Sequence, residues 1–173
     1  MKVKDVLVTA ALTIWTAQAL TAATYWDERF RYERAGDKFR PSEFQIDLFG
    51  SLATRDRSGD SQLTGGGGAG LNFFSTPVVG IGADTYIEQW EWPDHADGSL
   101  ILRWPFQAAG VAPYIFGGGG RQWRDIVQWT KHAGGGLEFR FNRYTGIFAD
   151  GRYIWPDETR DYVLMRGGLR IGF

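Results

Sequence analysis

The sequence lacks cysteine and is poor in histidine, with only His95 and His132. Without cysteine, disulfide frameworks, thiolate metal sites and cysteine nucleophiles are excluded, and two histidines are too few for a His-rich metal site. The 19 basic and 20 acidic residues give a formal charge of −1, so the chain as a whole has no electrostatic attraction for nucleic acid. We therefore expect no cofactor, no metal ion and no nucleic-acid partner.

Long apolar runs are also scarce. One run covers residues 6–20, behind Lys2 and Lys4 and ahead of small residues at 21–23, which is the layout of a secretory signal peptide. This run is shorter than the roughly 20 residues that a spanning helix needs. We expect a signal peptide over residues 1–23. Because no later run is long enough either, an integral membrane protein with this sequence would have to be a barrel.

Glycine and aromatic residues are abundant, with 24 glycines and 16% aromatic side chains. From residue 42 onward apolar and polar side chains alternate with a period of two, which predicts strands rather than helices. The predicted strands are 43–55, 62–74, 78–91, 99–106, 112–123, 128–141, 145–155 and 161–173. Their even number fits an all-β fold in which residues 43–173 close into an eight-stranded antiparallel up-and-down barrel, with both termini on the periplasmic side of a membrane.

The two faces of the predicted strands differ in chemistry. One face is apolar or small, and the charges that share its parity, Lys131 and Asp161, lie at segment ends. The other face carries five acidic and five basic residues, namely Asp47, Asp84, Glu88, Arg103, Glu138, Arg140, Asp150, Arg152, Arg166 and Arg170. The fifth segment does not sort in this way. Parity alone fits a soluble barrel or sandwich with the apolar face inside, or a membrane barrel with that face toward lipid.

The distribution of aromatic residues favours the membrane barrel. They gather at the two ends of the predicted strands, as in the interfacial girdles of outer-membrane barrels. One predicted girdle consists of Trp90, Trp92, Trp123, Trp129 and Trp155, and the other of Phe44, Phe73, Phe106, Phe141 and Phe173. Most segments also reach the 9–11 residues that a tilted strand needs to cross a bilayer.

The lengths of the predicted connectors also favour the membrane barrel. Tight turns are predicted at 75–77 and 142–144, and longer polar loops at 57–61, 91–98 and 156–160. Such an alternation fits short periplasmic turns and longer outer loops. We therefore predict that the charged face points into the lumen, where unpaired charges would be costly, and that its members form a plug of ion pairs.

Two segments resemble a known family. The chain ends on Phe173 with apolar residues at alternate positions before it, and residues 113–119 follow the pattern Pro-Tyr-x-x-Gly-x-Gly. Together with the order of signal, short N-terminal segment and eight strands, these features resemble the small eight-stranded outer-membrane barrels such as OmpA, OmpX and OmpW. The resemblance covers residues 43–173. It implies export through the periplasm to a Gram-negative-type outer membrane, where the barrel assembly machinery would read an insertion signal of Tyr162, Leu169, Ile171 and Phe173.

This family is functionally mixed, so the resemblance names no activity. The interior of an eight-stranded barrel is just wide enough for its own side chains. We therefore expect a monomeric barrel with a structural or adhesive role and no enzymatic activity. The alternatives are a narrow, porin-like pore or carrier for small or apolar solutes, and a soluble lipocalin-like binding barrel.

Three further features allow sharper interpretations. His95 lies in a predicted loop with Asp94, Asp97 and Ser99, which are residue types of acyl-transfer sites but also of ordinary turns.

Residues 24–42 form a predicted periplasmic segment, either solvated or a short helix that lies on the inner leaflet or covers the barrel mouth. The glycine run at 65–70 fits G-x-G-x-x-G, but no helix follows it, so we expect close packing beneath bulky lumen side chains instead of a dinucleotide site.

Overall fold

The computed structural model describes residues 37–57, 60–88, 93–123 and 126–173, so the predicted signal peptide lies outside the described residues. The described chain forms eight strands and no helix that is long and apolar enough to cross a membrane. The strands are β1 (Glu43–Arg57), β2 (Asp60–Phe74), β3 (Val79–Glu88), β4 (His95–Arg103), β5 (Val111–Gln122), β6 (Gln128–Arg140), β7 (Thr145–Pro156) and β8 (Tyr162–Gly172).

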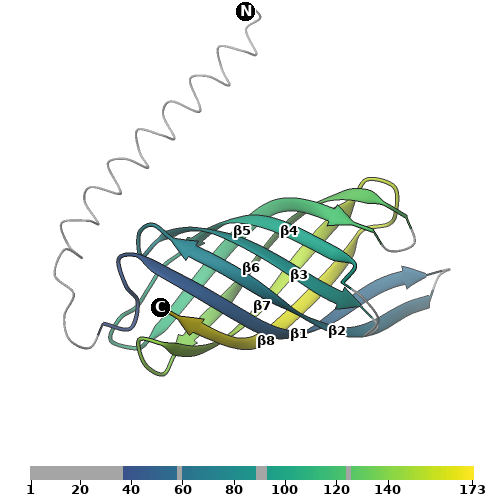
Figure 1. The fold of residues 1–173 in the computed structure, drawn as a ribbon. Helices are drawn as coiled ribbons and strands as arrows, with labels where there is room; N and C mark the ends of the chain where they lie inside the picture. The colour runs from purple at the N-terminus through teal and green to yellow at the C-terminus, as the bar shows by residue number, and fades with distance from the viewer. Residues whose placement is uncertain (1–36, 58–59, 89–92, 124–125) are drawn as a thin grey trace, which may run out of the picture. The chain divides into compact units, whose positions relative to one another are not determined.

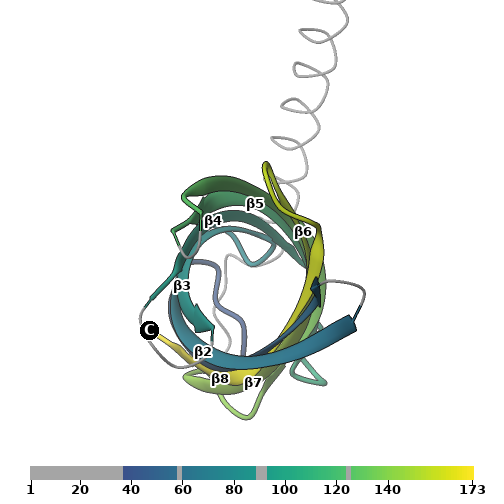
Figure 2. The ribbon, with the colours of Figure 1, turned by 90° about the vertical axis from the view of Figure 1, so that its right-hand side faces the viewer.

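Each strand pairs antiparallel with its neighbours in the sequence, and β8 pairs with β1 to close the barrel (Figures 1 and 2). The predicted closed, eight-stranded antiparallel barrel is therefore confirmed. The largest error concerns the fourth strand, which covers His95–Arg103 rather than 99–106. Trp104 and Phe106 follow this strand, and both keep side chains that are about half exposed (45% and 59%).

The barrel has two distinct ends. At the terminus end, where β1 begins and β8 finishes, the backbone N–H of Phe173 donates to the carbonyl of Phe44 over 2.8 Å. Connectors 75–78, 104–110 and 141–144 lie at this end, and 58–59, 89–94, 123–127 and 157–161 lie at the opposite, loop end. The predicted contrast between short turns and longer loops does not hold for the described connectors, because 104–110 at the terminus end is longer than 157–161 at the loop end.

The β1–β2 hairpin extends past the rim of the loop end (Figure 1). The two strands pair out to Arg57 and Asp60, whereas the last β1 partner on β8 faces Thr54 and the first β2 partner on β3 faces Gly66. The predicted polar loop at 57–61 is therefore mostly strand. In this part of the sequence the alternation of apolar and polar residues ends because the hairpin leaves the barrel wall, although β1 and β2 remain paired.

Apolar and charged side chains occupy opposite faces of the wall. Leu137 and Leu169 point outward with 56% and 57% of their surface exposed, while Arg103 and Glu138 are fully buried inside. The fifth strand, which parity did not sort, follows the same rule, because Tyr114 and Phe116 point into the lumen and Ile115 points out. This arrangement is the inverse of a soluble barrel, in which the apolar face lines the interior.

Candidate functional site in the barrel lumen

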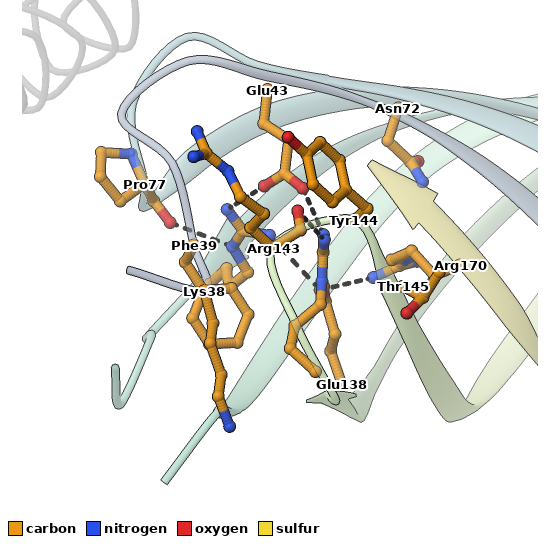
Figure 3. Close-up of polar contacts among 12 residues, drawn as sticks. Lys38, Phe39, Glu43, Asn72, Pro77, Glu138, Arg143, Tyr144, Thr145 and Arg170 are labelled. Carbon is orange, nitrogen blue, oxygen red and sulfur yellow. Dashed lines mark hydrogen bonds and ion pairs between the residues drawn. The ribbon is translucent and has the colours of Figure 1, made fainter. Parts of the chain in front are cut away.

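The first lumen cluster lies near the terminus end and contains three carboxylates and three guanidinium groups. They belong to Glu43, Asp47, Arg103, Glu138, Arg140 and Arg170. Glu138 accepts from Arg170 over 2.8 Å and from Arg103 over 3.4 Å, and it also pairs with Arg140. Glu43 bridges Arg103 and Arg140 (Figure 3).

Asp47 and Arg170 form a two-pronged pair in the same cluster. The Nε and Nη2 atoms of Arg170 donate to the two carboxylate oxygens of Asp47 over 2.7 and 2.6 Å. Asn72 adds a third hydrogen bond to this carboxylate over 2.8 Å. Parallel N–H···O bonds of this kind are among the strongest in proteins and fix the geometry of both partners. The cluster is thus electrically balanced and hydrogen-bonded throughout.

Phe39 packs against this cluster at the terminus end of the lumen. Its ring is fully buried, with the guanidinium carbon of Arg103 5.0 Å from the ring centre (Figure 3). The Gln107 side chain holds the segment in place, because it accepts from the N–H groups of Lys38 and Phe39 over 3.0 Å each and donates to the Phe39 carbonyl over 2.6 Å. The described part of the predicted 24–42 segment therefore covers the mouth, but it does so without forming a helix.

A second cluster occupies the middle of the lumen and contains Asp84, Asp97, Asp150, Arg152 and Arg166. Arg152 joins Asp84 and Asp97 over 2.9 and 3.1 Å. Arg166 donates twice to Asp150 over 2.8 Å and lies 3.1 Å from Asp84. A cavity of about 20 Å³ lies among these side chains, which is space for about one water molecule.

Ser99 lines this cavity, with His132 close to Ser99 and Asp97 close to His132. Ser99 Oγ lies 2.8 Å from His132 Nε2, whereas His132 Nδ1 lies 3.8 Å from Asp97, beyond hydrogen-bonding distance. Ser99 and His132 stand on β4 and β6, on either side of Gly118 of β5. A Cβ atom on Gly118 would lie 1.8 Å from the carbonyl oxygen of Gly98, so glycine opens the slot through which the two side chains meet. The cavity beside Ser99 is too small for an ester substrate.

The predicted acyl-transfer group in a surface loop does not form. His95 is the first residue of β4 and is buried, with its ring stacked on Tyr86 at a centroid distance of 4.3 Å. Asp97 and Ser99 likewise belong to the strand and point inward. The loop prediction failed because Asp97 and Gly98 have low strand propensity, which the pairing of β4 with β3 and β5 overrides. Among the described residues, no group of three or more histidines and carboxylates could hold a metal ion.

Nine of the ten predicted lumen residues point inward and form ion pairs in the described structure, and the side chain of Glu88 lies outside the described residues. Sequence analysis missed Glu43, Asp97, Phe39 and Gln107. The first two share the parity of the lumen face. Glu43 is the first residue of the predicted strand 43–55 and was left out of its lumen face, and Asp97 would have been found if the fourth strand had been predicted to start earlier. Phe39 and Gln107 lie outside the strands, where no periodic pattern identifies them.

The predicted girdles lie on the outer surface where they are described. Trp123, Trp129 and Trp155 are exposed at the loop end, and Trp90 and Trp92 lie outside the described residues. The second girdle is exposed at the terminus end, with exposed fractions from 40% to 59% for Phe44, Phe73, Phe106, Phe141 and Phe173. In the predicted insertion signal, Leu169, Ile171 and Phe173 point outward, but Tyr162 points inward, 3.5 Å from the hydroxyl of Tyr86.

Comparisons with known proteins identify the fold. No protein-family model matches the chain, and no curated protein sequence matches it. Among solved structures, the N-terminal β-barrel domain of Pseudomonas aeruginosa OprF is 16% identical, with a TM-score of 0.61 over 76% of this chain and 97% of that chain. Neisserial surface protein A is 13% identical, with a TM-score of 0.58 over 77% and 97%. A de novo designed transmembrane β-barrel, 13% identical, gives 0.56 over 78% and 98%. The chain therefore has the fold of the small eight-stranded transmembrane β-barrels.

Proposed function

We propose that the protein is an integral barrel of a Gram-negative-type outer membrane, with a closed lumen and a structural role. The observation that carries this proposal is the inverted distribution of side chains, with an apolar outer wall between two aromatic girdles and a charged interior. Such a wall would be unstable in water but matches the hydrocarbon core and the interfaces of a bilayer. A soluble lipocalin-like barrel needs the opposite arrangement.

The lumen geometry supports a plug. Eleven charged side chains from β1, β3, β4, β6, β7 and β8 are paired across the interior, and not only those on three consecutive strands as the sequence suggested. Breaking one buried pair to open a path costs about 3–5 kcal/mol, so wide openings would be rare. Phe39 adds a second barrier at the terminus end. Adhesion, the other predicted role, stays a prediction.

Two measurements test the proposal separately. Membrane insertion is tested by fractionation, in which the protein is expected to stay with membranes until detergent is added and to migrate as a compact band in unheated SDS. Release without detergent would contradict the membrane assignment. Closure is tested by conductance in planar bilayers, where we expect no steady current. Sustained large openings would instead support the pore alternative.

A further inference from the structure

A pair of arginines lies on the rim of the terminus end, apart from the lumen clusters. The guanidinium carbons of Arg40 and Arg143 lie 4.8 and 5.4 Å from the centre of the Tyr144 ring. Tyr144 is half exposed (51%) and lies in the 141–144 connector (Figure 3). Two positive charges are therefore held at one aromatic ring on the outer edge of the barrel.

Hydrogen bonds and packing fix the backbone of the two segments that carry Arg40 and Arg143. Phe39 is buried in the mouth and tied to Gln107, so the next residue, Arg40, emerges at the rim. On the other side, the Asn142 side chain accepts from the N–H groups of Tyr144 and Thr145 over 2.8 and 2.9 Å. The arginines are thus presented by ordered segments, which lowers the entropy cost of binding a ligand there.

Arg40 has an unused donor in this arrangement. Its Nε atom is buried and has no hydrogen-bond partner among the described residues. A buried N–H group without an acceptor is costly, so a shift of the Arg40 side chain that brings this N–H to an outside oxygen acceptor is favourable. Guanidinium groups match phosphate oxygens in both charge and geometry.

The charge and position of the rim suggest the source of that oxygen. Outside the lumen, the described charged side chains at the terminus end are Asp37, Lys38, Arg40 and Arg143, three positive and one negative, which sum to +2. The exposed girdle residues Phe141 and Phe173 lie at the same end, so the arginines stand at the edge of the apolar wall. If this wall lies in a bilayer, as proposed above, the edge lies at the depth of the lipid headgroups.

We propose that Arg40, Tyr144 and Arg143 form a binding site for the phosphate of an anionic phospholipid in the leaflet at the terminus end. A headgroup with net negative charge, such as that of phosphatidylglycerol, fits the +2 rim. Phosphatidylcholine carries the same phosphate, but its choline cation would be repelled by the two arginines. The inference rests on the proposed membrane location and goes beyond it by naming a lipid class and its contact residues.

The test uses the full chain reconstituted in phosphatidylcholine vesicles that contain a minor fraction of phosphatidylglycerol. Native mass spectrometry after mild extraction measures the two lipids that stay bound. The wild-type protein is expected to retain phosphatidylglycerol preferentially, and Arg40→Gln and Arg143→Gln are each expected to lower that preference about fivefold. The control variant Lys131→Gln/Arg160→Gln removes two positive charges at the loop end and is expected to keep the preference.

The outcomes separate this inference from the proposed function. A wild-type protein that fails to insert into the vesicles contradicts the membrane location. An inserted protein that retains both lipids equally, or an inserted Arg40→Gln/Arg143→Gln variant that still selects phosphatidylglycerol, overturns the lipid site. Excess inorganic phosphate is expected to leave the lipid bound, because the acyl chains also contact the apolar wall. Displacement by phosphate would overturn the assignment to a lipid.

Discussion

Replacing Glu138 by glutamine should destabilise the barrel more than any other single charge removal at the terminus end, because this carboxylate contacts three arginines. It is fully buried and pairs with Arg103, Arg140 and Arg170. Glutamine keeps the volume of the side chain, so the change removes charge without leaving a cavity. Three guanidinium groups would then face two carboxylates in a desolvated space. Leaving a buried charge uncompensated costs about 3–5 kcal/mol in free energy of unfolding.

Urea unfolding of the protein in detergent micelles, followed by tryptophan fluorescence, measures this free energy. Lys131→Gln is the control on the same strand, since Lys131 is 75% exposed and lies 3.7 Å from Asp157, a surface pair worth about 0–1 kcal/mol. Adding Arg103→Met to Glu138→Gln restores the charge balance and should recover part of the loss. If Glu138→Gln costs no more than Lys131→Gln, the ion pairs contribute nothing to stability and the reasoning is refuted.

Three further predictions concern the wall, the glycine slot and the segment that closes the mouth. Leu137→Arg, on the half-exposed outer face, should lower the stability of the inserted protein by about 2–4 kcal/mol if it lies near the bilayer midplane, measured by refolding into vesicles, whereas a water-facing leucine would tolerate the change. Gly118→Ala should abolish the compact unheated band in SDS because of the 1.8 Å clash, while Gly151→Ala, with nothing within 4 Å, should keep it; equal behaviour would argue against the slot. Gln107→Ala removes three hydrogen bonds, worth about 0.5–1.5 kcal/mol each, so trypsin should cleave faster after Lys38 than in a Gln128→Ala control, and an unchanged rate would mean that Gln107 does not hold the segment.

The barrel itself was predictable from sequence because its signal is repeated in every strand. Each correctly placed strand alternates between lipid-type and lumen-type side chains, so small errors at individual ends do not change the fold. Parity placed Leu137 and Glu138 on opposite faces, and the aromatic residues at the strand ends indicated which face points outward. The fifth strand was harder, because the glycines at 117–120 have no side chains to show which face points outward.

The pairing of the lumen charges was less predictable. Arginine side chains are long enough to reach past a neighbouring strand, as when Arg152 of β7 contacts Asp84 of β3. Such contacts depend on the diameter of the barrel and on which positions of the neighbouring strands are glycine. Neither can be read from the sequence pattern of one strand. The position of Phe39 is set by a hydrogen-bonded connector, not by periodicity, so only the folded chain reveals it.

The Asp47–Arg170 pair affects how β1 and β8 join to close the barrel. The two residues are direct partners in the β1–β8 register and are separated by 123 positions along the chain, so they meet only when the first and last strands join. A slip of one residue at this seam would turn the Arg170 guanidinium to the apolar outer face of the barrel. The pair thus stabilises one register of β1 against β8 and disfavours the registers that are shifted by one residue.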